Sequence, residues 1–80
     1  MNLDQAPLSA VMRVARVRVL AGQEDQARQL EEIGFLPGEP VRVMSRGGWG
    51  GDPLAVRVGL STFALRRDEA ACIELEDPHA

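Results

Sequence analysis

Cysteine and histidine are scarce in this chain, which has one of each, Cys72 and His79, among 80 residues. Small secreted domains are normally held together by an even set of cysteines in disulfides, so the single thiol indicates a reducing, cytoplasmic compartment. A metal centre needs several converging ligands. Only Asp77 and His79, near the C-terminus, are weak candidates for a divalent ion. We therefore expect no intrinsic metal site and no cofactor beyond weak or adventitious metal binding.

Lysine and tyrosine are absent, and the aromatic residues are one tryptophan and two phenylalanines. All nine basic residues are arginine, and twelve acidic residues outnumber them, which gives a formal net charge of −3. Nucleic-acid-binding proteins usually carry a basic patch, and those that bind single strands add exposed aromatic side chains. Arg13, Arg16 and Arg18 form a basic run without such aromatics. We therefore expect no nucleic-acid partner.

Long hydrophobic runs are also absent, although 45% of the residues are hydrophobic. Asp4, Arg13 and Arg16 interrupt the N-terminal region, which excludes a signal peptide, and no stretch approaches the ~18 apolar residues of a membrane span. A chain of this length forms one small domain. We expect a soluble cytoplasmic protein with no direct membrane insertion, in which a flexible leader (1–7) precedes the domain (8–76) and a polar tail (77–80) follows it.

Alternating apolar and polar residues predict short strands. In the first strand, within 12–19, Ala15, Val17 and Val19 face one side while Arg16 and Arg18 face the other. The alternation slips at 13–14, which indicates either a bulge or the start of the strand. Opposite charges on the first and last strands predict pairs of Arg16 and Arg18 with two glutamates, Glu74 and Glu76. The same reasoning places further strands at 41–44, 54–58, 63–65 and 72–76, with Arg57 pointing outward, and a glycine-rich loop at 47–53.

A helix is predicted over 23–33, because Ala27, Leu30 and Ile33 form an apolar stripe. Gly34 follows where a left-handed residue ends a helix, and Leu30 and Phe35 then occupy the apolar positions of a Schellman motif. The segment 36–39, with proline and glycine at its centre, predicts a type II turn. A single helical turn at 67–70, with Asp68 as its cap, precedes the last strand.

These elements predict a mainly β fold: a small SH3-like barrel of about five strands, with one short helix after the first strand and a single helical turn before the last. Catalytic chemistry is not expected. The glycine-rich loop lacks the lysine and hydroxyl residue of a phosphate-binding P-loop, and Cys72 has no visible base to activate it. We interpret Cys72 as a small residue of the barrel.

Three segments, in order, resemble the ferrous-iron-transport protein A (FeoA) family: LEEIGFLPG (30–38), GDPL (51–54) and ALRRDEAACI (64–73). The family has leucine more often at position 33, and the Gly-Gly-Trp-Gly stretch at 47–50 looks inserted. The resemblance implies an SH3-like accessory protein of the membrane ferrous-iron permease, which carries a cytosolic GTPase domain. The motif positions that we expect to be structural are Gly34, Pro37, Gly38, Gly51, Asp52, Pro53 and Ala70.

The resemblance therefore favours a non-enzymatic bacterial module that binds the cytosolic domain of the permease and modulates it through an apolar surface near the helix end. The alternative is a metal-responsive accessory or a dimerisation module. We expect a monomer or a weak homodimer. The candidate partner contacts are Leu30, Phe35, Leu36, Trp49 and Arg66.

Overall fold

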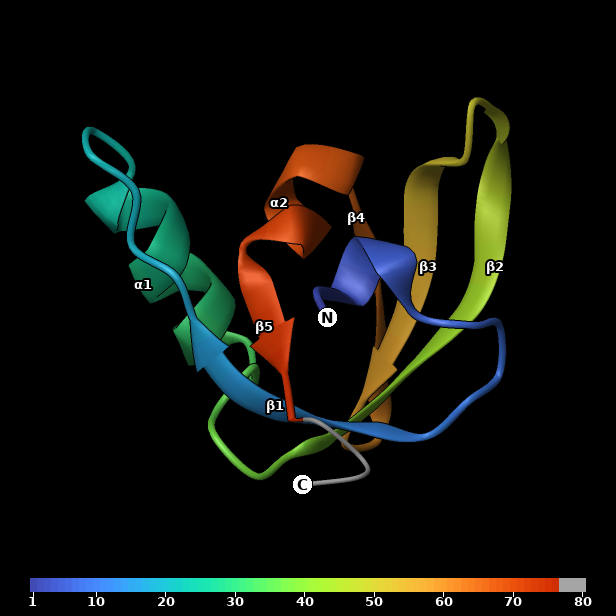
Figure 1. Ribbon diagram of the computed structural model, residues 1–80, viewed down its shortest axis with the longest axis horizontal. Helices are drawn as coiled ribbons and strands as arrows, with labels where there is room; N and C mark the ends of the chain where they lie inside the picture. Colours follow the sequence, from blue (N-terminus) through green and yellow to red (C-terminus); the bar gives the residue numbers. More distant parts are fainter. Residues whose placement is uncertain (77–80) are drawn as a thin grey trace.

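The computed structural model describes residues 1–76, except for the side chain of Trp49 (Figure 1). Within this part, five antiparallel strands follow one another in the spatial order β4-β3-β2-β1-β5 and curl around an apolar core. No helix of this part is long and apolar enough to cross a membrane. In chain order the elements are the 3-10 turn η1 (Leu3–Gln5), β1 (Met12–Val17), α1 (Glu24–Glu32), β2 (Pro40–Trp49), β3 (Asp52–Val58), β4 (Ser61–Leu65), α2 (Arg67–Ala71) and β5 (Ile73–Leu75).

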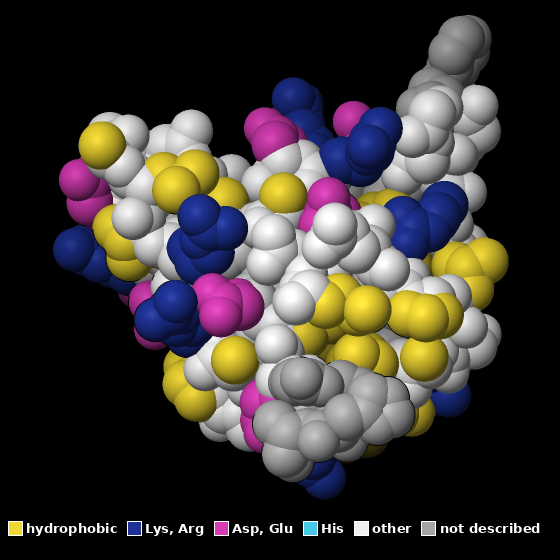
Figure 2. All heavy atoms as spheres, viewed as in Figure 1, with side chains coloured by type: hydrophobic (Ala, Val, Ile, Leu, Met, Phe, Trp, Pro, Cys, Tyr) yellow, Lys and Arg dark blue, Asp and Glu magenta, His cyan; other side chains and the backbone are white. Residues whose placement is uncertain are grey.

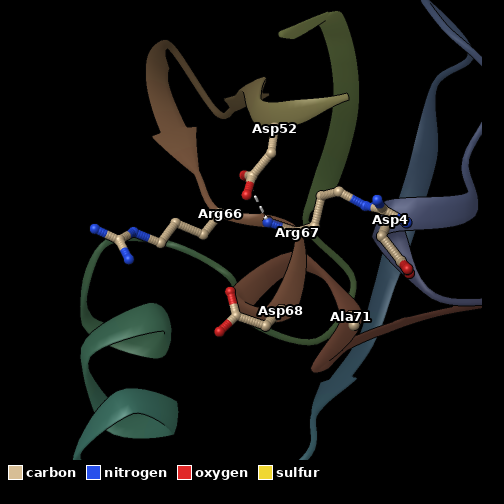
Figure 3. A pocket seen from close by; sticks show the side chains of 6 residues that line it. All are labelled: Asp4, Asp52, Arg66, Arg67, Asp68 and Ala71. Carbon is tan, nitrogen blue, oxygen red and sulfur yellow. Dashed lines mark hydrogen bonds between the residues drawn. The ribbon is translucent and has the colours of Figure 1, made fainter. Parts of the chain in front are cut away.

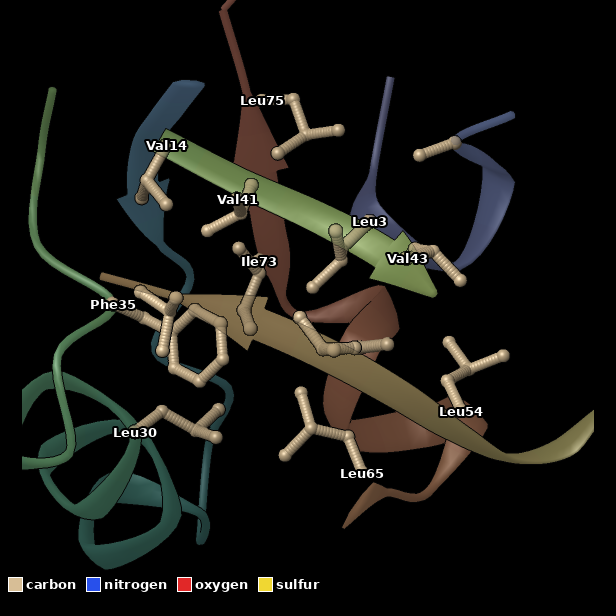
Figure 4. Close-up of a cluster of buried hydrophobic side chains, with 14 residues drawn as sticks. Leu3, Val14, Leu30, Phe35, Val41, Val43, Leu54, Leu65, Ile73 and Leu75 are labelled. Carbon is tan, nitrogen blue, oxygen red and sulfur yellow. The ribbon is translucent and has the colours of Figure 1, made fainter. Parts of the chain in front are cut away.

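Strand alternation is clearest in β3, where Leu54, Val56 and Val58 are buried and the residues between them are not. Figure 4 shows the core that these side chains join, with Phe35 and Ile73 also fully buried. The predicted mainly β fold, with a helix after the first strand and a helical turn before the last, is confirmed.

The first strand differs from its prediction. A register shift between Val14 and Arg16 makes Ala15 a bulge, so Val14 lies fully in the core. The strand ends at Val17, and Val19 beyond it is 60% exposed. The predicted inward face is therefore confirmed for Val17, which is half-buried against the core. It was wrong for Ala15 and Val19, because the inserted residue and the early end of the strand change which side chains face the core.

The cross-strand charge pairs are half confirmed. Arg16 Nε lies 3.0 Å from Glu74 Oε2, as the sequence predicts. In the antiparallel register, however, the amide of Glu76 donates to the carbonyl of Arg13, and the amide of Arg18 donates to that of Cys72. Arg18 therefore lies opposite Cys72 and not opposite Glu76, so the second predicted pair does not form.

The N-terminal segment is folded, which corrects the expectation of a flexible leader. Leu3 and Ala6 are fully buried in the core, and η1 packs against α2 and β5. Arg46 ties this segment to β2, because its guanidinium donates to the carbonyls of Asp4 (2.9 Å) and Ala6 (2.7 Å). Leu3 and Ala6 thus complete the core, although two apolar residues are too few to form a recognisable pattern in the sequence.

Helix α1 ends as predicted. The amide of Gly34 donates to the carbonyl of Glu31, and that of Phe35 donates to the carbonyl of Leu30, each at 3.1 Å, which is the double hydrogen bond of a Schellman motif. Gly34 has φ +125°, a conformation that favours glycine. The following type II turn is confirmed by the 3.0 Å bond from the Glu39 amide to the Leu36 carbonyl together with φ +87° at Gly38.

The glycine-rich segment is a strand hairpin, which corrects the loop predicted at 47–53. Strand β2 continues to Trp49, β3 begins at Asp52, and the two-residue connection is Gly50-Gly51, with φ +65° and +83°. Two consecutive residues with positive φ match the twist of a hairpin. At Gly47 a Cβ atom would overlap the backbone carbonyl of Asp52, so the strands approach closely there.

Candidate functional site

The apolar pair expected to contact a partner lies inside the molecule. Leu30 is 2% exposed and Phe35 is fully buried among the core side chains in Figure 4. Both side chains fold inward because the Schellman ending of α1 turns the chain onto the barrel. The prediction that these two residues form a contact surface was wrong for this conformation. Leu36, the next residue, is 46% exposed and remains a candidate contact.

Two further candidate contacts, Trp49 and Arg66, lie in the β2–β3 hairpin and at the start of α2. The backbone of Trp49 pairs with Asp52 at the hairpin tip, but its side chain lies outside the described part of the structure. Arg66 is exposed and is the N-cap residue of α2. Its side chain lines an open hollow of about 480 Å³, drawn in Figure 3. The other residues that line the hollow are Asp4, Asp52, Arg67, Asp68 and Ala71.

Asp52 connects the hairpin to α2 across this hollow. Its Oδ1 accepts a hydrogen bond from the Arg67 amide at 3.1 Å, the bond dashed in Figure 3. In return, the Arg67 guanidinium donates to the carbonyl of Gly50 at 3.1 Å. A carboxylate at the first amide of a helix satisfies a group with no partner inside the helix. The Gly-Asp-Pro segment (51–53) therefore has a structural role.

The predicted cap of α2 was also different. Asp68 lies inside the first turn, where its Oδ1 accepts from the Glu69 amide at 3.1 Å. Glu69 in turn accepts from the Arg66 amide at 2.8 Å, and Arg66 is the N-cap, so the helix starts two residues earlier than a cap at Asp68 requires. These carboxylates accept hydrogen bonds from backbone amides, and none of them is paired with a nucleophile.

Metal ligands do not converge in the described part of the chain. Among residues 1–76, no three histidine, cysteine or acidic side chains lie close enough to hold an ion. One buried oxygen, Asp4 Oδ1, has no hydrogen-bond partner among these residues. The weak metal candidates, Asp77 and His79, lie outside the described residues.

Cys72 is a buried free thiol. Burial raises its pKa, an effect that the negative charges of Asp68 and Glu69 reinforce and that Arg18 opposes. Its Sγ lies 3.4 Å from the carbonyl of Asp68, at a distance that suits a weak S–H donor. A thiol that stays protonated is a poor nucleophile, so the environment fits the predicted role of a small barrel residue.

A second, smaller hollow was not anticipated from the sequence. It measures about 140 Å³ and is lined by residues at the start of β2 and the end of β3, together with Val11. Alternation along 54–58 places Arg57 outward, but only the strand register shows that Arg42 lies directly opposite it. Leu60, in the turn that follows, is 93% exposed. The signal available in the sequence was a leucine next to Gly59, in the tight turn between two predicted strands.

Comparison with known proteins identifies the relatives of this chain. The family model for the FeoA domain matches residues 1–77. The FeoA of Stenotrophomonas maltophilia, described as a prokaryotic SH3 domain protein and solved in complex with zinc, is 41% identical, with a TM-score of 0.86 over 95% of this chain and 89% of that one. No match is found among curated proteins.

Two solution structures share the fold. Iron(II) transport protein A from Clostridium thermocellum is 28% identical, with a TM-score of 0.80 over 99% of this chain and 46% of that one. The FeoA protein of Chlorobium tepidum has a TM-score of 0.79 at 24% identity, covering 99% of this chain and 76% of that one. The SH3-like architecture predicted from the sequence is therefore confirmed.

Proposed function

Because the chain belongs to the FeoA family, whose members are SH3-like accessory proteins of ferrous iron transport, we propose that it binds the cytosolic domain of the membrane ferrous-iron permease and modulates transport. Asp52, Asp68 and Glu69 accept hydrogen bonds from backbone amides, Glu74 pairs with Arg16, and the one thiol is buried. These roles favour a chain that acts by binding over one that acts by catalysis. The protein works on the cytoplasmic side of the membrane, where this domain of the permease lies.

One observation carries this proposal: apolar side chains are exposed at one end of the barrel. Leu36, Leu60 and Val11 are 46%, 93% and 65% exposed. They belong to the turn that leads into β2, the turn between β3 and β4, and the segment before β1, and all three segments lie along the bottom of Figure 1. Val11 and Gly59, the neighbour of Leu60, line one hollow. Figure 2 draws the same view with side chains and shows that hydrophobic ones reach the surface among the charged ones. Exposed apolar side chains grouped on a small domain favour an interaction surface.

The test is titration of the full chain with the purified cytosolic domain of the permease. Leu36→Asp should weaken binding by roughly tenfold or more, because a charge would enter the apolar contact. Leu20→Asp is the matched control, since Leu20 is 41% exposed and belongs to the segment between β1 and α1, which lies at the upper left of Figure 1 and away from these turns. Both variants should unfold at about the same temperature as the wild type.

Uptake of ferrous iron in a strain that lacks the gene gives the second readout. Wild-type protein and Leu20→Asp should restore uptake, and Leu36→Asp should not. Absence of binding by the wild type at micromolar concentrations, together with unchanged uptake in the deletion strain, would refute the proposal.

A further inference from the structure

Two arginines face each other across neighbouring strands. Arg42 on β2 and Arg57 on β3 are direct partners in the antiparallel register, so their side chains leave the same face of the sheet. Thr62 continues this row on β4, opposite Arg57. Like charges at directly opposed positions destabilise a sheet. A pair of this kind in a protein with a net charge of −3 therefore needs an explanation.

Neither guanidinium is satisfied within the described structure. Among the described side chains, Arg42 and Arg57 form no ion pair and no side-chain hydrogen bond. Other arginines are used: Arg16 pairs with Glu74, and Arg13 donates to the carbonyl of Gly38 at 2.8 Å. Ten donor N–H groups, five on each guanidinium, thus remain free for a ligand.

The surroundings combine this positive charge with apolar surface. The 140 Å³ hollow between the two arginines is lined by Val11, Pro40, Val41 and Gly59, and no acidic side chain lines it. Val11 is 65% exposed, and Leu60, next to Gly59, is 93% exposed. Arginine beside exposed apolar residues is the composition of protein–protein contact centres.

We propose that Arg42 and Arg57 together bind the carboxylate of an aspartate or glutamate on a protein partner, while apolar neighbours of that residue pack on Val11 and Leu60. A carboxylate between two guanidiniums accepts bidentate, charge-assisted hydrogen bonds and removes the repulsion between the arginines. The proposal rests on the proposed function, in that it takes the partner to be the cytosolic domain of the permease.

Charge complementarity favours a protein carboxylate over a polyanion. The hollow accommodates one small anionic group, its margins are apolar, and the molecule as a whole carries net negative charge. A nucleic acid would present repeated phosphates to a protein that repels it at long range. A single acidic side chain with apolar neighbours matches both the charge and the margins.

The first experiment uses a defined probe and needs no permease. The acetylated, amidated tripeptide Leu-Glu-Leu is titrated into the full chain, and the NMR signals of the arginine Nε–H groups are followed. The signals of Arg42 and Arg57 should shift together, and those of Arg28 on α1 should not. Leu-Gln-Leu should produce no shift. An equal or larger response to inorganic phosphate would overturn the assignment to a carboxylate peptide.

The second experiment titrates the permease domain with three variants. The double variant Arg42→Gln/Arg57→Gln should bind at least about thirtyfold more weakly, as expected for loss of a buried charged contact. Arg28→Gln removes one charge elsewhere and should bind as the wild type does. Arg42→Lys/Arg57→Lys keeps the charge but loses the bidentate geometry, and should lie between them. The double glutamine variant should melt no lower than the wild type, because it removes a repulsion.

The outcomes separate the site from the proposed function. If the wild type and the double glutamine variant bind the permease domain equally, the site is wrong and the function stands. If the permease domain does not bind while the tripeptide shifts both arginines, the site stands and the function is wrong. Self-association of the wild type that the double glutamine variant abolishes would overturn the assignment to the permease, with a second copy of the chain as the occupant.

Discussion

At the scale of the residue, Cys72 shows how composition and burial combine. Burial raises the pKa of its thiol above the ordinary value of 9.0. The chain has no lysine and no tyrosine, the other two side chains that commonly ionise in the alkaline range. Cys72 is therefore the side chain whose ionisation we expect to follow above about pH 9.

This environment predicts an alkaline loss of stability with a single cause. The pKa of the Cys72 thiol is higher in the folded protein than in the unfolded chain. Its contribution to the free energy of unfolding is therefore complete at pH values below the unfolded-state pKa, and is lost as the pH rises through the folded-state pKa. The free energy of unfolding should therefore fall above about pH 9, by at most about 1.4 kcal/mol per pH unit. Urea unfolding followed by circular dichroism between pH 8 and 11 measures this slope.

The matched variant is Cys72→Ala, which removes the titrating group. Its free energy of unfolding should be nearly independent of pH over the same range. A slope equal to that of the wild type would show that another group causes the pH dependence and that burial does not raise the pKa of the Cys72 thiol.

At the scale of the element, the geometry of the β2–β3 hairpin requires glycine at one of two adjacent positions and not at the other. Gly47 and Gly48 are adjacent, but a Cβ atom on Gly47 would overlap the Asp52 carbonyl, whereas a Cβ atom on Gly48 would meet no atom within 4 Å. The difference arises from the register shift between Arg46 and Trp49, which brings Gly47 against the neighbouring strand. Glycine at a close approach of two backbones is a geometric requirement.

Alanine substitutions at these two positions should therefore differ. Gly47→Ala should lower the free energy of unfolding by about 1–3 kcal/mol, because the strands must shift to admit the methyl group. Gly48→Ala should change it by less than about 0.5 kcal/mol. Chemical denaturation of the two variants beside the wild type makes the comparison, and equal effects would contradict the hairpin geometry.

At the scale of the whole molecule, the N-terminal segment is part of the core. Leu3 is fully buried, although it lies in a stretch of sequence without periodicity, and η1 fills the space beside α2 and β5. A domain of 80 residues has little apolar surface to bury, so each fully buried leucine is a large share of its stability. The barrel is thus incomplete without residues that precede its first strand.

Truncation of this leucine should be severe. Leu3→Ala should lower the free energy of unfolding by about 2–4 kcal/mol, the usual cost of removing a buried leucine. Leu8→Ala, at a leucine that is 54% exposed, should cost less than about 0.5 kcal/mol. Thermal and urea unfolding of both variants test the contrast, and a Leu3→Ala variant as stable as the wild type would restore the picture of a flexible leader.

Features that depend on near neighbours could be predicted from the amino-acid sequence. The helix ending at Gly34, the turn at 36–39 and the alternation along β3 were predicted correctly, because each follows from backbone preferences within about six residues. The family resemblance, and with it the SH3-like fold, also rested on short segments in order along the chain.

The tertiary structure alone decided what depends on register and on packing between distant segments. One bulge at Ala15 changed the inward face of β1, and the antiparallel pairing set Arg18 opposite Cys72. The same kind of pairing set Arg42 opposite Arg57. Local preferences carry no information on such partners, because register comes from the summed burial of the whole core and a shift of one residue reverses which side chains reach the surface.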